Sequence, residues 1–253
     1  MTTTASTSTI GTRDEASLRS RIPAAFRLQF TVPSQLIWVP LIVFGASWVI
    51  SFGIGFWINQ ITEAEYGVAD SVTGASQATI WTLGFLAAYV SSHTFPFALA
   101  LSYSRRVFMI GVSLAFAAVS ACFGLGAALA AWLEEATDGF GVGAYTFAMP
   151  LLIDDGLVAL GLFAAALAFA VMQFGFFWAS LYRRLRLIQL WAVIIAMVLV
   201  LAVAAMMITT YDGWAAVGRW FLQQHIAGLA GWLGLLSLLG VGANYAVIRR
   251  STA

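Results

Sequence analysis

Few side chains in this 253-residue chain have the type and spacing that chemistry requires. Adjacent glutamates such as Glu134 and Glu135 occur in some intramembrane proteases, but such a site would need a histidine on a neighbouring segment at the same depth. By the arginine pattern described below, His93 and His225 fall on opposite sides of a membrane, and no HExxH or Cys/His cluster occurs. We therefore predict no metal site and no catalytic residues, and interpret the glutamate pair as a solvated helix end.

The basic residues of the chain exclude a P-loop ATPase site. All 12 are arginines, and no lysine occurs. A phosphate loop of the GxxxxGK type needs its lysine to reach the phosphates. The chain is therefore not itself a P-loop ATPase, and we expect it to hold no cofactor.

Polar residues within the apolar stretches are too few for a proton relay. Proton-coupled carriers keep ionisable groups in the membrane interior, whereas every Asp and Glu here lies in a loop or at the end of an apolar stretch. We interpret the interior polar groups as interhelical hydrogen bonds rather than substrate ligands; they are Tyr89, Ser91, Ser92, Gln173 and Asn244. The single cysteine, Cys122, lies in an apolar run and can form no disulfide within the chain.

The elements that position these residues must be membrane helices. The chain is 61% hydrophobic and 9% charged, whereas about a quarter of the residues in a soluble domain are charged. A helix needs about 20 apolar residues to cross the hydrocarbon core. The predicted fold is an all-α membrane protein, with one six-span domain over 19–253 after a disordered tail, 1–18. Six stretches are long enough: Leu36–Ile58, Thr79–Leu101, Val107–Leu133, Gly156–Leu181, Leu187–Ile208 and Ile226–Ile248.

Charges in successive loops indicate the orientation of these spans. Arginines gather before the first span, after the second, after the fourth and after the sixth, whereas acidic residues gather in the alternate loops. Arg219 is the one exception. Because arginine-rich loops stay on the cytoplasmic side, both termini are predicted to be cytoplasmic, in a bacterial inner membrane.

Two segments outside the spans are amphipathic. Ser20–Gln35 mixes arginines with aromatic residues and predicts a helix in the cytoplasmic interface, with an irregular juxtamembrane segment as the alternative. Tyr211–His225 predicts either an outer interfacial or re-entrant helix, or a loop anchored by its aromatic residues. Asp154 and Asp155 precede the fourth span and are expected to cap its N-terminus.

The order of these features resembles the type-2 permease family of ATP-binding-cassette exporters, over nearly the whole chain. The shared features are an interfacial N-terminal helix, six spans, a short inner loop after the second span and an amphipathic outer segment before the sixth. The most specific stretch is Ser91–Gly111, SSHTFPFALALSYSRRVFMIG. It looks like actinobacterial permeases in which an aromatic–proline pair and paired arginines flank this loop.

The resemblance implies that this loop is a coupling helix that rests on an ATP-binding-cassette ATPase subunit. ATP and Mg²⁺ are then bound by that partner, and a second copy or a related permease completes a dimer. Pro96 lacks a backbone N–H, so we expect the regular helix of the second span to kink or end there. The implied contact segment is Thr94–Arg106, with Thr94, Phe95, Pro96, Phe97, Leu99, Tyr103, Arg105 and Arg106 as its contact residues.

The resemblance implies export, and aromatic spans without interior charges favour an amphipathic or hydrophobic small molecule, peptide or lipid as the substrate. Trp81, Phe85 and Tyr89 of the second span are candidate residues of the translocation pathway, although lipid contact or helix packing explains them equally well. Membrane lipids are the other expected partners, and no nucleic acid is expected. The alternative function is a membrane anchor or assembly subunit that transports nothing.

Overall fold

The computed structural model describes residues 21–62, 71–72, 74–141 and 143–249, so the predicted disordered tail, 1–18, lies outside the described residues. The described chain is almost entirely helical, and its first helix covers residues 21–28. The following elements are η1 (Ser34–Trp38), α2 (Val39–Thr62), β1 (Ser71–Val72), α3 (Ser76–Tyr89), η2 (Val90–Thr94), α4 (Phe95–Ala100), α5 (Arg105–Ala136), η3 (Gly139–Gly141), β2 (Ala144–Tyr145), α6 (Pro150–Ile153), α7 (Leu157–Arg184), α8 (Leu187–Thr210), α9 (Trp214–Gln223) and α10 (Ile226–Arg249).

Six of the described helical segments are long and apolar enough to cross a membrane, which confirms the predicted number of spans. Their ends differ from the predicted stretches by three residues or fewer. The agreement follows from the solvent, because lipid cannot satisfy a backbone N–H or C=O and so each apolar run must form its own hydrogen bonds as a helix. The spans are Ser34–Ile58, Ser76–Ala100, Arg105–Ala136, Leu157–Arg184, Leu187–Thr210 and Ile226–Arg249.

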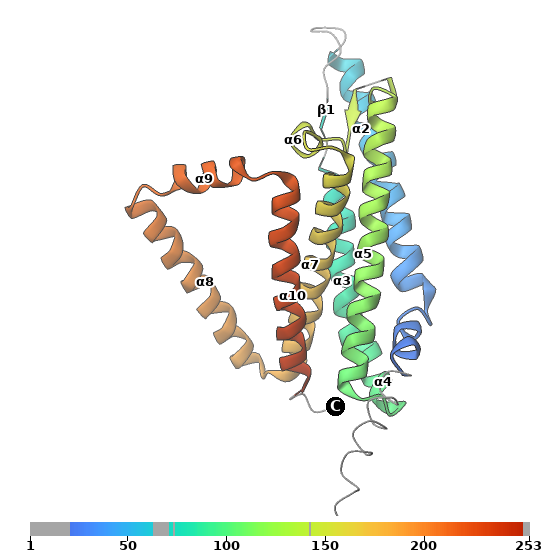
Figure 1. Cartoon of the computed structure of the whole chain (residues 1–253), viewed down its shortest axis with the longest axis vertical. Helices are drawn as coiled ribbons and strands as arrows, with labels where there is room; N and C mark the ends of the chain where they lie inside the picture. The colour runs from blue at the N-terminus through green and yellow to red at the C-terminus, as the bar shows by residue number, and fades with distance from the viewer. Residues whose placement is uncertain (1–20, 63–70, 73, 142, 250–253) are drawn as a thin grey trace, which may run out of the picture.

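The two ends of the helical bundle differ in charge. We call one the arginine end, where Arg21, Arg27, Arg105, Arg106, Arg183, Arg184, Arg186 and Arg249 lie, and the other the acidic end, where Glu134, Glu135, Asp138, Asp154, Asp155 and Asp212 lie. The arginine end is at the bottom of Figure 1 and the acidic end at the top. His93, in η2, lies toward the arginine end and His225, before α10, at the acidic end, so the structure keeps the two histidines apart.

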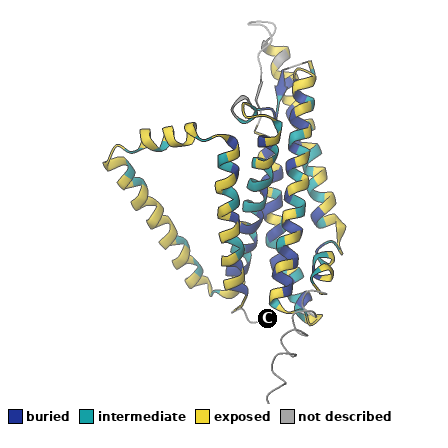
Figure 2. Ribbon diagram, viewed as in Figure 1, coloured by how far each residue is buried: buried dark blue, intermediate teal, exposed yellow. Residues whose placement is uncertain are grey.

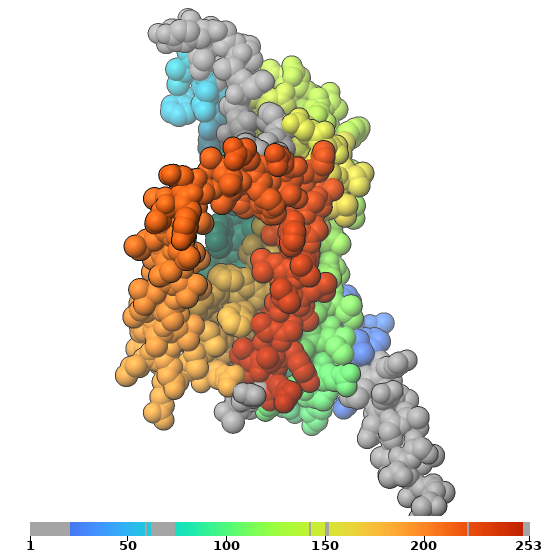
Figure 3. Space-filling model, turned by 60° about the vertical axis from the view of Figure 1, so that its left-hand side comes forward, coloured from blue at the N-terminus to red at the C-terminus, as the bar shows by residue number. Residues whose placement is uncertain are grey.

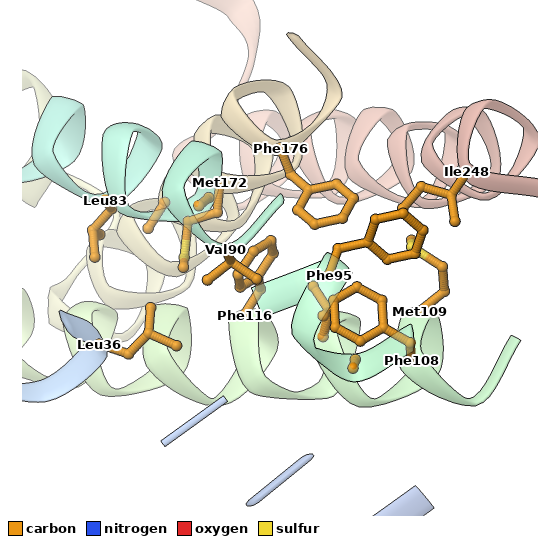
Figure 4. Packing of buried hydrophobic residues seen from close by; sticks show 14 residues of the cluster. Leu36, Leu83, Val90, Phe95, Phe108, Met109, Phe116, Met172, Phe176 and Ile248 are labelled. Atoms are coloured by element: carbon orange, nitrogen blue, oxygen red, sulfur yellow. The ribbon is translucent and has the colours of Figure 1, made fainter. Parts of the chain in front are cut away.

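α7 is the central helix of the bundle, with α3, α5 and α10 packed around it and α2 beside α3 (Figure 1). The main core lies toward the arginine end, where side chains from several elements converge (Figure 4). Within it the Phe95 and Phe108 rings lie 5.2 Å apart, and the Phe116 and Phe176 rings 5.9 Å apart. Its larger members are Leu36, Leu83, Val90, Phe95, Phe108, Met109, Phe116, Met172, Phe176 and Ile248.

Glycines let α7 approach its neighbours backbone to backbone. A Cβ atom added at Gly175 of α7 would overlap the carbonyl oxygen of Gly84 in α3, and one at Gly84 would lie 2.9 Å from Val171. On α5, a Cβ atom at Gly124 would overlap the carbonyl oxygen of Gly161. Small residues at such crossings increase van der Waals contact between membrane helices, where no hydrophobic effect favours association.

A buried amide pair joins α7 to α10. The Asn244 side-chain NH₂ donates to the side-chain oxygen of Gln173 at 2.8 Å and to its backbone carbonyl at 3.1 Å. Both side chains are almost completely buried. The predicted role of these two residues as interhelical hydrogen bonds is therefore confirmed.

α8 stands apart from the other spans. It has no buried residue among its 24, and its only notable packing partner is α7, to which it is directly connected. Its surface is exposed along its whole length (Figure 2). α9 runs across the acidic end from α8 to α10, which confirms the helical alternative for this segment, and Figure 3 shows an unfilled hollow between α8 and α10.

Candidate functional site

The segment that the sequence analysis assigned to a partner ATPase lies at the arginine end, between α3 and α5. The second span stays helical through α3, η2 and α4 to Ala100. Ser102 then adopts a positive φ of 60°, and the N–H of Tyr103 donates to the carbonyl of Ala98 at 3.1 Å, which closes the end of α4. Ser104 caps the next helix, since its hydroxyl accepts the Val107 N–H at 3.3 Å.

Pro96 acts through the turn that precedes it. In the wider π-helical turn η2, Phe95 donates its N–H to Val90 rather than to Ser91. Because Pro96 has no N–H, the Ser91 carbonyl loses its other helical donor as well. Arg183 of α7 supplies the missing bond, with Nη1 2.6 Å from that carbonyl oxygen. The expected kink is therefore a π-turn within a helix that continues to Ala100.

A second contact joins η2 to α7. The hydroxyls of Ser91 and Ser180 are 2.8 Å apart, which confirms Ser91 as an interhelical hydrogen-bonding residue. The Arg183 guanidinium also lies 5.5 Å from the centre of the Phe95 ring, within cation–π range. The turn is thus attached to the central helix of the bundle.

The predicted contact residues differ in how far they are buried. Phe95 is buried, and Leu99 and Tyr103 pack against the main core, so these three side chains are largely occupied within the chain. Thr94 and Pro96 are partly buried. The large exposed side chains of the segment are Phe97, Leu101 and Arg106, and Phe97 is 53% exposed; the small residues Ala100, Ser102 and Ser104 are exposed as well.

The two adjacent arginines have different environments. Arg105 donates from Nη1 to the backbone carbonyl of Arg249 at 2.8 Å, so it joins the start of α5 to the end of α10. Arg106 is exposed, and no hydrogen bond or ion pair to another described residue is recorded for it. Both lie in the first turn of α5, where a positive charge meets the positive end of the helix dipole. Two accounts explain cations at that position: the arginines anchor this end of the span at anionic headgroups, or they contact a partner protein.

The N-terminal helix, residues 21–28, contacts Tyr103 of the same segment and packs against α5. Ala25 is fully buried against α5, where a Cβ atom added at Gly111 would lie 2.8 Å from it. The Arg21 guanidinium lies 5.5 Å from the centre of the Tyr103 ring. The helix is shorter than the predicted Ser20–Gln35, because it ends at residue 28 and a turn leads into η1.

Trp81, Phe85 and Tyr89 share one face of α3, as their four-residue spacing requires. All three are exposed, Phe85 at 74%. Trp81 and Phe85 border a groove of about 290 Å³ between α3 and α7, with Phe174 and Trp178 on the opposite wall. The structure thus brings Trp81 and Phe85, but not Tyr89, to an apolar groove on the outer surface of the single chain.

The prediction for the glutamate pair is wrong for Glu134, which is fully buried. Its carboxylate accepts the indole N–H of Trp48 at 2.8 Å. It also accepts three successive backbone N–H groups of the following loop, from Thr146 at 3.0 Å and from Phe147 and Ala148 at 2.9 Å each. Glu134 therefore joins α2, α5 and this loop, and no sequence motif indicated that the loop folds back over it.

Asp155 caps a different helix from the one predicted. Its Oδ2 accepts the N–H of Ile226, the first residue of α10, and its Oδ1 lies 2.9 Å from Nδ1 of His225. A carboxylate can only accept, so Nδ1 carries the proton of this bond. The N-terminus of α7 itself, after Gly156, has no side-chain cap. Asp155 thus links the acidic ends of α7 and α10.

The stability of this link is expected to depend on pH. The hydrogen bond from His225, and then that from the Ile226 N–H, lowers the pKa of Asp155. A carboxylate with a lowered folded-state pKa contributes its full stability above its unfolded pKa and loses it as the pH falls through the folded value. Acidification should therefore lower the midpoint temperature of thermal unfolding less in Asp155→Asn than in the unmodified chain. Asp154→Asn is the control, and equal acid dependence in both variants would contradict this role.

The described residues contain no group of three or more His, Cys, Asp or Glu placed to hold a metal ion. Six apolar helices, oppositely charged ends and an apolar surface define the chain as a multi-pass membrane protein. No family model matches the chain, and neither a curated protein nor a solved structure matches it.

Proposed function

We propose that this chain is the transmembrane permease subunit of an ATP-binding-cassette exporter, with ATP and Mg²⁺ bound by a separate ATPase subunit. In this proposal the arginine end faces the cytoplasm of a bacterial cell and receives the ATPase. One observation carries the proposal: the segment Thr94–Arg106 exposes the large side chains of Phe97, Leu101 and Arg106, while Phe95, Leu99 and Tyr103 pack in or against the core.

Exposed side chains on a segment that is packed against the core suit a surface through which a partner could move the bundle. Phe97 and Leu101 offer apolar contact, and the Arg106 guanidinium fits a carboxylate of a partner with two parallel hydrogen bonds. Behind them, Phe95 packs on Phe108 and Arg183 holds the Ser91 carbonyl. A displacement imposed on the turn would therefore move α5 and α7 together, as a rigid-body change of the bundle requires.

The substrate in this proposal is an amphipathic or hydrophobic molecule. The groove between α3 and α7 is lined by aromatic and small side chains, with Trp81, Phe85, Phe174 and Trp178 at its border. Such walls favour apolar groups, since a bare ion in the membrane interior would need compensating charges. The groove lies on the surface of one chain, and a second copy or a related permease would enclose it in a dimer.

The coupling role predicts a selective loss of ATP hydrolysis. The complex is purified from its native membrane through a tag on this chain, and its ATPase rate is measured in membranes of the same lipid composition. Phe97→Ala with Arg106→Lys should insert normally yet reduce that rate about tenfold or more, because lysine keeps the charge but loses the planar fork. Arg27→Lys, at the same end but outside the turn, is the control. Full activity of the double variant would contradict coupling through this turn.

A non-transporting anchor or assembly subunit is the second candidate. It is favoured by α8, whose exposed surface within the described chain could receive helices of a larger complex. The same purification distinguishes the two functions. If the chain is an anchor, the purified complex should hydrolyse no ATP, or its ATPase rate should not change when hydrophobic compounds are added. If the chain is an exporter subunit, the ATPase rate of the complex should change when the substrate is added.

A further inference from the structure

A cavity with two arginines lies between the ends of α7 and α10 at the arginine end. Its volume is about 330 Å³, within the size range of small-molecule sites. Arg184 comes from the last turn of α7 and Arg249 from the last turn of α10. Its walls are Arg184, Tyr245, Ala246, Val247 and Arg249.

The guanidinium groups of Arg184 and Arg249 form no hydrogen bond or ion pair with another described residue. In contrast, Arg105 and Arg183 at the same end each donate to a backbone carbonyl. The described residues of the arginine end include no Asp or Glu, because every described acidic residue lies at the acidic end. No described residue therefore supplies a counter-charge to Arg184 or Arg249.

The geometry of the cavity favours a phosphate. Arg184 and Arg249 stand at helix C-termini, where the helix dipole favours cations, and both line the same cavity. Each guanidinium can give two parallel hydrogen bonds to phosphate oxygens. Tyr245 is 37% exposed and has a hydroxyl that can donate a further bond.

The surroundings of the cavity favour a lipid over a soluble anion. α8 starts at Leu187, three residues after Arg184, and diverges from α10 toward the acidic end. The hollow between them is visible in Figure 3, and both helices carry many exposed apolar residues, such as Leu199 in α8 and Leu239 in α10. Acyl chains fit this hollow, since its walls are as apolar as the bilayer interior.

We infer that this cavity binds the phosphate of an anionic phospholipid, with the acyl chains along the hollow between α8 and α10. The lipid replaces the protein contacts that α8 lacks, and it neutralises Arg184 and Arg249. Basic pockets between membrane helices are suited to anionic headgroups. Lipid binding here requires only that the helices span a membrane, and it is independent of any ATPase partner.

The test is native mass spectrometry of the full chain in detergent, titrated separately with phosphatidylglycerol and phosphatidylcholine. One phosphatidylglycerol should bind more tightly than phosphatidylcholine. In Arg184→Gln/Arg249→Gln its affinity should fall about tenfold to thirtyfold, because two arginines near an anionic group are removed. Arg27→Gln/Arg106→Gln is the matched control, with the same charge change at the same end but outside the cavity, and it should change the affinity by less than about threefold.

Three results would overturn the inference. Equal losses in the two glutamine pairs would indicate a diffuse attraction to the arginine end. Phosphatidylcholine binding as tightly as phosphatidylglycerol would remove the role of charge, and displacement of phosphatidylglycerol by millimolar inorganic phosphate would identify a soluble-anion site. If the glutamine pair fails to insert, Arg184→Lys/Arg249→Lys is tested in its place, because lysine keeps the positive charge but lacks the planar guanidinium. A reduced affinity of this variant for phosphatidylglycerol supports the paired arginine site, and an unchanged affinity rejects it.

Discussion

Replacing Gly175 by alanine is expected to destabilise the protein by about 3 kcal/mol, although glycine-to-alanine changes within helices usually stabilise by about 0.5–1 kcal/mol. The sign reverses because the added methyl group would overlap the carbonyl oxygen of Gly84, which is backbone and cannot rotate away. α3 and α7 would have to separate along the crossing. Equilibrium unfolding in mixed detergent micelles measures this loss.

Gly53→Ala is the matched control for that change. Gly53 lies within α2, and a Cβ atom added there would meet nothing within 4 Å. The control should be neutral or slightly stabilising. A Gly175→Ala variant as stable as Gly53→Ala would show that α3 and α7 do not cross at these glycines, and would remove the support for the groove beside them.

Replacing Glu134 by glutamine should cost about 3 kcal/mol of unfolding free energy, because a buried carboxylate with four donors is exchanged for an amide whose NH₂ must face some of them. The loop donors, in Thr146, Phe147 and Ala148, would be left partly unsatisfied. Cleavage by a protease between residues 137 and 153 should become faster. Both thermal unfolding and the rate of limited proteolysis measure the effect.

The neighbouring residue supplies the control for Glu134. Glu135→Gln removes the same charge from the same end of α5, but Glu135 is exposed, so its effect should stay within about 0.5 kcal/mol. Equal proteolysis of the two variants would contradict the role of Glu134 as the residue that holds the loop. A stable loop at the acidic end matters for the proposed exporter, because rigid-body rocking of the bundle needs both ends of α5 to move with their neighbours.

The predicted coupling residues show how much of a functional site a local sequence pattern can predict. The sequence placed Thr94–Arg106 at a short arginine-containing turn, and the structure has such a turn there. Arg105 and Arg106 are indistinguishable in the sequence, yet one donates to Arg249 and the other is exposed. The partner carbonyl belongs to a helix that ends 144 residues later, so only the folded chain separates their roles.

Sequence alone determined the six spans and the separation of arginine-rich from acidic ends, because lipid imposes these features on each segment independently of its neighbours. Interior amides such as Asn244 were also predictable as interhelical groups, since a polar side chain in an apolar span needs a partner. These constraints are local, and a window of about 20 residues contains them.

Tertiary structure alone decided which helices meet and which polar groups find each other. Gly84 with Gly175, and Asp155 with the start of α10, are pairings between distant segments, and spacing within one segment carries no information about them. Glu134 was predicted to be solvated because helix ends usually are, and a loop that folds back onto it reversed that outcome. The separation of α8 from the bundle has the same origin: in lipid, an apolar helix is equally well solvated alone or packed, so composition cannot decide between the two.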